Sequence, residues 1–336
     1  MNGRPRRRNT PPDHGIRVPA EAMESLVTAL FQAAGMSAGH AGTMAQLLVD
    51  TDLHCVFSHG TRQTAGYIGM IREGRVNAAP QIRVEADFPA GQVLDGDGGM
   101  GHLACHQATV ACIAKAKEAG VAAATTRNHF HFGAAGKYTR MALAADCIGI
   151  AMSSHRFQVG RNGNLSGAGV GSPMSIGIPT GEQPPLVLDM GGPGLPATEE
   201  LLDRVPGAVY KALGMSMSIV SLGGILPGIY RPQYIPPTSR WESNQGTFVI
   251  VLDAARFAPL DELKAEMDRY VGDARALDPL PGEASAETAG SAEWTWAAQN
   301  RREGIPVDEE HQQLLEGIAG ELGVEVPFGQ FESTRF

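Results

Sequence analysis

Two histidines, His129 and His131, stand at the end of a run of small and β-branched residues, 121–126, that predicts a buried strand. Gly133 and Gly136 follow them and permit close backbone approach, and a helix is expected just beyond. A strand-to-helix junction that carries imidazoles can supply a general acid or base, because histidine alone has an unperturbed pKa near working pH. The alternative is that one or both histidines only form hydrogen bonds within the loop.

The motif R-N-H-F-H-F-G-A-A-G-K-Y at 127–138 resembles R-N-S-N-H-F-G-x-A-G-x-Y, a signature of the malate/L-lactate dehydrogenase family. This non-Rossmann family includes ureidoglycolate, sulfolactate and diketogulonate dehydrogenases and cyclic imine reductases. The resemblance extends from about residue 17 to residue 326. In the signature, the histidine directly before Phe-Gly donates and accepts the proton. The resemblance therefore implies that His131, and not His129, is the catalytic residue.

A second stretch, S-H-G at 58–60 followed by Tyr67, resembles the family's S-H-G-x-x-R-x-x-x-Y, whose histidine, arginine and tyrosine lie near the substrate carboxylate. The arginine position holds Gln63, and an arginine stands one residue earlier, at Arg62. One residue is a rotation of about 100° on a helix, and glutamine offers one neutral hydrogen bond in place of a bidentate guanidinium. We expect His59 and Tyr67 to hold the substrate with help from Arg62 or Gln63. The alternative for Arg62 is a solvated helix charge.

Two further stretches resemble segments that lie along the nicotinamide and diphosphate in the family. G-S-P stands where T-N-P is expected, and D-M-G-G-P stands where D-M-A-T-S is expected. A serine hydroxyl can still donate and accept, and glycine amides can still face a phosphate. The residues that the resemblance assigns to the cofactor here are Ser172, Pro173, Asp189, Met190 and Gly191. The alternative for the aspartate is ordinary turn capping.

The family usually continues with a long excursion before a glycine-rich motif that carries a cofactor-facing lysine. This chain passes from Pro196 to Arg204 and directly into V-P-G-A-V-Y-K, so some dozens of residues are absent. Lys211 matches the lysine, although the two glycines before it are replaced by Val209 and Tyr210. Its alternative is a solvated helix lysine. We expect NAD or NADP as the cofactor, and nothing in the sequence chooses between them.

The segment G-D-G-G-M-G at 96–101 satisfies the pattern G-x-G-x-x-G. A Rossmann fingerprint also requires an acidic residue about 20 positions on, at the end of the next strand, and Arg127 and Asn128 stand there instead. We interpret the segment as a strand-to-helix turn outside the dinucleotide site. Potential metal ligands cluster beside it: Asp95, Asp97, His102, Cys105 and His106. A zinc site needs further ligands and a supporting shell, so no metal is expected.

The composition favours a folded protein with small-molecule partners. The chain has 336 residues, 43% of them hydrophobic, and a formal net charge of −9, which argues against a nucleic-acid partner. No run of 18 apolar residues and no signal-peptide core is present, so we expect a cytoplasmic protein without a membrane partner. The four cysteines form no C-x-x-C pair, which is typical of reduced, buried thiols.

The fold expected from these patterns and the resemblance is α/β, with a mixed, largely antiparallel nucleotide-binding sheet and a helical substrate and dimerisation domain built from both chain ends. A disordered basic leader is expected at 1–16, the helical domain at 17–80 and 258–336, and the nucleotide-binding domain with the catalytic histidine at 81–257.

The expected activity is hydride transfer between a nicotinamide cofactor and C2 of a small 2-hydroxy or 2-oxo acid, or a cyclic imine, by a homodimer as the resemblance implies. The alternative is a non-catalytic or cofactor-impaired relative that binds a ligand or a partner. Three departures favour that alternative: Gln63, the rewritten glycine turns and the missing excursion before Lys211.

Overall fold

The computed structural model describes residues 9–159, 165–169, 171–192, 195, 197–235 and 239–336. The chain forms two compact units. A helical unit combines the described residues up to Ala79 with Ser291–Phe336, and a sheet unit comprises Pro80–Gly290. The helical unit is thus built from both ends of the described chain.

The helical unit combines helices with a short antiparallel ribbon. Strand β1 (Ile16–Val18) pairs with β9 (Ile305–Val307), and the apolar side chains at both ends of each strand are fully buried. Pro19 precedes the first helix, and the Ser37 side chain caps the second. The helices are α1 (Ala20–Ala33), α2 (Ala38–Leu53), α3 (Thr64–Arg72), α9 (Ser291–Glu303) and α10 (Glu309–Leu322).

Residues 15 and 16, which were expected in a disordered leader, belong to the folded helical unit. Gly15 and Phe336 exchange two backbone hydrogen bonds of 3.3 and 3.0 Å, and Ile16 is fully buried opposite Val307. The sequence pattern missed this strand because three residues are too few to show an alternation. Residues 1–8, which carry the basic cluster, lie outside the described residues.

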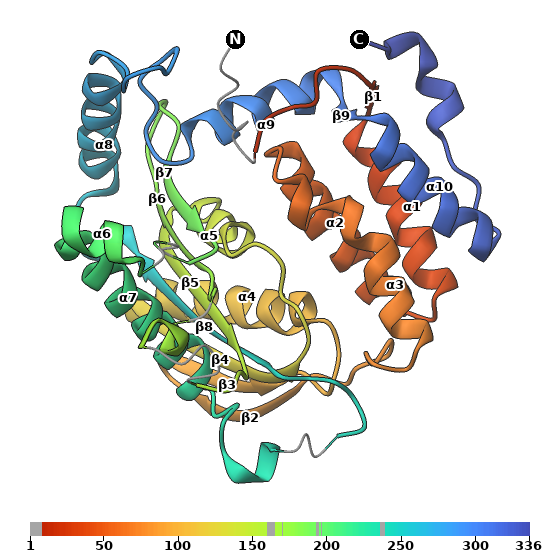
Figure 1. Ribbon diagram of the computed structural model, residues 1–336, viewed down its shortest axis with the longest axis horizontal. Helices are drawn as coiled ribbons and strands as arrows, with labels where there is room; N and C mark the ends of the chain where they lie inside the picture. The colour runs from red at the N-terminus through yellow and green to blue at the C-terminus, as the bar shows by residue number, and fades with distance from the viewer. Residues whose placement is uncertain (1–8, 160–164, 170, 193–194, 196, 236–238) are drawn as a thin grey trace. The chain divides into compact units, whose positions relative to one another are not determined.

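The sheet unit contains a seven-stranded sheet in the order β2-β3-β4-β8-β5-β6-β7 (Figure 1). Among the described strands only the pair β3 and β4 is parallel, and helix α4 (Gly101–Ala119) makes the crossover between them. This arrangement confirms the mixed, largely antiparallel sheet. The strands are β2 (Arg83–Phe88), β3 (Gly91–Asp95), β4 (Val121–His129), β5 (Cys147–His155), β6 (Met174–Ile178), β7 (Leu186–Met190) and β8 (Gln245–Asp253).

The core of the sheet unit lies where α4 and α5 (Gly136–Leu143) pack on the central strands. Its side chains are small on the strands and larger in the loop and helix that follow β4, with Phe132 and Tyr138 among the largest buried residues of the chain. All four cysteines are free and buried. The remaining helices are α6 (Glu199–Arg204), α7 (Pro206–Val220) with its π-helical extension (Ser221–Ile225), and α8 (Leu260–Arg275).

The stretch Pro206–Ile225 is long and apolar enough to cross a membrane by length and composition, and one third of its most apolar window is buried. A core helix of a soluble protein satisfies the same criteria. Its extension lies directly against the sheet, since a Cβ on Gly223 would come 2.7 Å from the carbonyl carbon of Ser153 in β5. Only glycine allows this approach.

Helix α8 and the segment after it belong to the sheet unit, not to the helical unit as expected from the sequence. The backbone N–H groups of Gly181, Glu182 and Gln183 donate to the Asp268 carboxylate at 2.9–3.0 Å. The boundary lies after Gly290 rather than before residue 258. An amphipathic helix shows in its sequence which of its own faces is apolar, but not which surface covers that face.

Asp268→Ala should detach α8 from the loop at 181–183 and lower the melting temperature by about 2–5 °C, since about 1–2 kcal/mol of partly solvent-screened hydrogen bonding is lost. Burial raises the pKa of Asp268, but the three backbone hydrogen bonds lower it more, so the net pKa lies below the usual value. This stabilisation is present above the unfolded pKa of about 4 and disappears as the pH falls through the folded value. Circular dichroism melts at pH 7 and pH 3 test both points.

The matched control is Asp273→Ala on the same helix, because its side chain is 75% exposed and makes only a 3.9 Å ion pair with Arg269. Equal losses in the two variants at pH 7 would contradict a role for Asp268 in holding α8.

A buried histidine makes the stability of the sheet unit depend on pH. His129 is fully buried at the end of β4, and burial lowers its pKa to about 4. The unfolded chain takes up a proton near pH 6.5, so the stabilisation is complete above that pH and falls by about 2 kcal/mol between pH 7 and pH 5. Urea unfolding of the native chain should show this loss, and His129→Gln should reduce the slope. Identical slopes would show that His129 titrates normally.

Candidate functional site

The loop that carries His131 is held by the helices on either side of it. The His131 carbonyl accepts hydrogen bonds from the Gly101 amide at 3.0 Å and from His102 Nδ1 at 3.2 Å, both at the start of α4. The next residue, Phe132, stacks on Tyr138 of α5 with ring centroids 5.3 Å apart, and the tyrosine hydroxyl donates to its carbonyl. The main chain at His131 is therefore fixed while its side chain is only half-buried.

The structure separates the two motif histidines by environment. His129 Nδ1 lies 2.7 Å from the Phe130 carbonyl, and Nε2 lies 2.8 Å from Thr126 Oγ1. A carbonyl only accepts, so Nδ1 carries the proton and Nε2 accepts from the threonine hydroxyl. His129 is thus a neutral core residue whose two nitrogens both form hydrogen bonds. This matches the alternative that one of the two histidines only forms hydrogen bonds within the loop. His131 is the one that a ligand can reach.

Two further groups lie beside this loop: Lys137, which the sequence did not single out, and His102, which it offered only as a potential metal ligand. Lys137 is 1% exposed although it lies in the first turn of α5, where the helix dipole disfavours a cation. Its Nζ and His102 Nε2 lie 2.6 and 2.5 Å from the point that a Cβ on Gly133 would occupy, so the two nitrogens are neighbours. The ring of His102 also meets that of His131 edge-on, with centroids 6.2 Å apart. Because lysine is exposed in most proteins, only the position of Lys137 inside the motif could have indicated a role at this site.

Asp189 forms a contact between strand β7 and helix α5. A Cβ on Gly136, the first residue of α5, would overlap Asp189 Oδ2 and lie 2.9 Å from Arg140 Nη1. The carboxylate therefore lies at the N-terminal end of the helix, where the dipole favours a negative charge. Met190, the last residue of β7, is half-buried and pairs with Met174 of β6.

A pocket of about 110 Å³ lies between the glycine-rich turns and α7. Its described lining residues are Ser166, Gly169, Gly171, Gly191, Gly192, Leu195, Ala197, Val209, Ala212, Leu213 and Ser216. A Cβ on Gly192 would lie 3.3 Å from the Ser172 carbonyl oxygen. The two turns expected to share the cofactor are therefore in contact. Exposed amides of such turns suit phosphate oxygens, and the volume suits a diphosphate rather than a whole dinucleotide.

The other expected cofactor residues surround this pocket less directly. The Ser172 hydroxyl is 1% exposed and donates to Ser154 at 3.0 Å, so it points into the sheet. The Pro173 carbonyl accepts from the Ser153 amide at 3.1 Å. Lys211 is exposed on α7, next in sequence to Ala212 of the pocket.

The expected substrate residues all lie in the helical unit. His59 Nδ1 is 2.9 Å from Ser58 Oγ, and Gln63 Nε2 donates to the Ser58 carbonyl at 2.9 Å. Tyr67 is 3% exposed, and burial raises the pKa of its hydroxyl. These contacts hold the S-H-G turn against the start of α3.

Arg62 differs from both interpretations of its sequence. Its guanidinium forms an ion pair with Asp308, the N-cap residue of α10, and lies over the Phe57 ring at 5.5 Å from the centroid. It is therefore neither a solvated charge nor a guanidinium with its full charge available to a carboxylate. The sequence could not show this, because the partner is 246 residues away along the chain.

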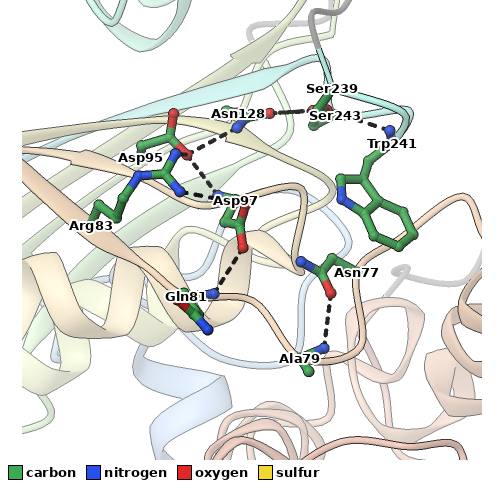
Figure 2. A network of polar contacts seen from close by, with 10 residues as sticks. All are labelled: Asn77, Ala79, Gln81, Arg83, Asp95, Asp97, Asn128, Ser239, Trp241 and Ser243. Atoms are coloured by element: carbon green, nitrogen blue, oxygen red, sulfur yellow. Dashed lines mark hydrogen bonds and ion pairs between the residues drawn. The ribbon is translucent and has the colours of Figure 1, made fainter.

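The glycine turn at 96–101 has a structural role, in agreement with the interpretation of its sequence. The Gly96 and Gly98 amides donate to the carbonyls of Arg127 and Asn128 at 2.8 Å, and a Cβ on Gly98 would overlap the Trp241 ring. Figure 2 shows the polar network around the turn, in which Asp95 and Asp97 share Arg83 at 3.1 and 3.6 Å. Within the described part of the chain, no three His, Cys, Asp or Glu side chains are placed to hold a metal ion.

Comparison with known proteins extends over almost the whole chain. A malate dehydrogenase from Pyrococcus horikoshii is 28% identical over 92% of this chain and 96% of its own length. The solved malate dehydrogenase structure from the same organism aligns with a TM-score of 0.81 over 94% of this chain and 98% of that one. A ureidoglycolate dehydrogenase (NAD(+)) from Escherichia coli O157:H7 is 23% identical over 94% of this chain and 100% of its own length.

The family model for malate/L-lactate dehydrogenase matches residues 18–192 and 196–316. These ranges include the His131 loop, both glycine turns and α7. The match confirms the resemblance first indicated by the motif around His131, and the chain belongs to the malate/L-lactate dehydrogenase family.

Proposed function

We propose that this protein is a nicotinamide-dependent oxidoreductase that interconverts a small 2-oxo acid, or a cyclic imine, and its reduced form. The observation that supports this most is the contrast at the end of β4. His129 is a neutral core residue, whereas His131 is half-buried on a loop whose main chain is fixed by α4 and α5. A titratable group on a rigid support is what general acid catalysis requires.

The sheet unit fits part of a dinucleotide. Gly171, Gly191 and Gly192 line the pocket beside α7, and a Cβ on Gly171 or Gly191 would meet no atom within 4 Å, so the backbone there is open to a ligand. Lys211 on α7 would add a positive charge near the diphosphate. When bound, the nicotinamide supplies or accepts the hydride.

His131 handles the proton. In reduction, its protonated ring donates a proton to the oxygen or nitrogen on C2 as the hydride arrives at the carbon. In oxidation, the neutral ring takes the proton from the hydroxyl or amine. The two hydrogen bonds to the His131 carbonyl fix the main chain from which the ring extends, which reduces the motion that must be lost on the way to the transition state.

The substrate contacts assigned to His59, Gln63 and Tyr67 by the resemblance stay predictions, as do the homodimer and the cytoplasmic location. The ion pair between Arg62 and Asp308 favours His59 and Gln63 over Arg62 as carboxylate partners. A neutral amide binds a carboxylate less strongly than a bidentate guanidinium does, so we expect a high KM for 2-oxo acids.

A panel of pyruvate, oxaloacetate, glyoxylate derivatives and cyclic imines with NADH and NADPH tests the proposal. We expect slow oxidation of one of the two cofactors with at least one substrate. Absence of turnover above a control without enzyme would favour the alternative of a cofactor-impaired relative that binds a ligand.

His131→Asn should lower kcat by ~10²–10⁴-fold, because a positioned general acid is lost, and should leave NADH affinity nearly unchanged. The matched control is His106→Asn, a half-buried histidine of α4 that is outside the proposed site. Steady-state kinetics and nicotinamide fluorescence titration provide the measurements. Equal losses in the two variants would mean that the acid is placed wrongly.

Cofactor binding should be weak, with Kd about 0.1 mM or higher, because the rewritten turns remove hydrogen-bonding side chains from the phosphate site. Lys211→Ala should weaken it further, and so should high salt. Lys115→Ala is the matched control, since that lysine forms an ion pair of 2.8 Å with Asp87 instead. Micromolar binding that is insensitive to Lys211→Ala would place the phosphate site elsewhere.

A further inference from the structure

The side chain of Asn128 joins three segments at the end of the catalytic strand. Its Nδ2 donates to Asp95 Oδ1 at 2.9 Å, and its Oδ1 accepts from Ser243 Oγ at 2.6 Å and from Ser239 Oγ at 3.5 Å. Figure 2 shows the amide between the aspartate on one side and the two serines on the other. Both ends of the amide are used, and only an amide offers a donor and an acceptor in this geometry.

The backbone at the same residue interrupts the strand. Asn128 has a φ of +54°, in the left-handed region, and the register of β4 against β8 shifts between Thr126 and His129. Asparagine enters this region more readily than most residues other than glycine. The shift is a β-bulge, which adds one residue to β4 relative to its partner strand.

The bulge decides which side chains of the motif enter the core. Ala122, Ala124 and Thr126 are buried, so a regular alternation would bury residue 128 and turn residue 129 outward. Instead Asn128 is half-buried and His129 is fully buried. The extra residue therefore returns His129 to the core face, and the His131 loop starts from that shifted position.

The partners of the amide explain why asparagine fits. Asp95 is 5% exposed, and its Oδ1 also accepts from the Asp97 amide at 2.8 Å and pairs with Arg83 at 3.1 Å. An aspartate at position 128 would place a second carboxylate against it. A leucine at position 128 would remove one hydrogen-bond partner from the Asp95 carboxylate and one from the Ser243 hydroxyl.

The network also ties the bulge to the segment before β8. The Trp241 amide donates to Ser239 Oγ at 3.4 Å, and the Trp241 ring covers Gly98 of the glycine turn. Arg240 lies over the same ring, 4.3 Å from its centroid. The bulge thus has support from both chain segments that face it.

We propose that Asn128 is a positioning residue for His131: its left-handed backbone and its amide hold the bulge that sets where the His131 ring lies. Asn128 does not touch the reacting atoms. The inference rests on the proposed role of His131 as proton donor, and one part of its test is independent of that role.

The kinetic test uses Asn128→Gly, which keeps the left-handed backbone but removes the amide, and Ser243→Ala, which removes the 2.6 Å hydrogen bond. Both should lower kcat by about 10–10²-fold, should change the NADH Kd less than twofold, and should raise the solvent deuterium isotope effect on kcat because proton transfer becomes slower. The matched control is Asp146→Gly, since Asp146 is a second non-glycine residue at φ +54° in the sheet unit. It loses only a partly exposed ion pair with Lys264, and glycine suits its backbone, so kcat and the isotope effect should not change.

The test without catalysis follows the histidine rings by NMR. In the native chain the His129 ring should not titrate between pH 7 and pH 5. In Asn128→Val, whose branched side chain disfavours the left-handed backbone, His129 should begin to titrate in this range and the His131 ring signals should move. In Asn128→Gly, the His131 signals alone should move.

Kinetic losses in Asn128→Gly and Ser243→Ala below twofold, or equal to those of Asp146→Gly, would overturn the proposal. If the native chain has no turnover, the proposed function fails. The NMR experiment alone then decides whether Asn128 positions His131. Unchanged His131 signals in Asn128→Gly would then overturn it, and a moved His131 ring would support it. If Asn128→Val does not fold, Asn128→Gly and Ser243→Ala carry the test.

Discussion

The buried ring of His129 is the constraint on which the rest of the site depends. Its two nitrogens hold the Phe130 carbonyl and the Thr126 hydroxyl, so the last residues of β4 and the first residues of the loop are fixed relative to each other. A Cβ on Gly101, the first residue of α4, would lie 2.6 Å from His129 Nδ1. The start of α4, the end of β4 and the His131 loop therefore share one packing centre, and a charged His129 would disrupt all three.

The glycine turn before α4 owes its composition to this packing rather than to a nucleotide. The Trp241 ring covers Gly98, and Gly101 lies against the loop of His131. A Cβ on Gly99 would lie 2.6 Å from the Pro80 ring. A pattern of glycines reports that something approaches the backbone closely, and both a phosphate and a side chain satisfy it. The pocket beside α7 is lined instead by Gly169, Gly171, Gly191 and Gly192.

Helix α7 and its π-helical extension expose several large apolar side chains. Tyr210, Met217 and Ile225 are 63%, 40% and 56% exposed along α7 and its π-helical extension. The same helix supplies Val209, Ala212, Leu213 and Ser216 to the pocket. A cofactor held there would depend on backbone amides and on one lysine, so its affinity would be sensitive to salt.

The sequence by itself determined the elements and the family. The strand predicted from residues 121–126, the helix expected beyond Gly136 and the motif around His131 all express interactions between residues close in sequence. The structure and the family match agree with them. The tertiary structure decided what depends on distant partners: the burial of Lys137, the ion pair of Arg62 with Asp308, the place of α8 and the bulge at Asn128. A local pattern shows that a face or a charge needs a partner. It does not name that partner, because the contact forms only when segments far apart in the chain fold together.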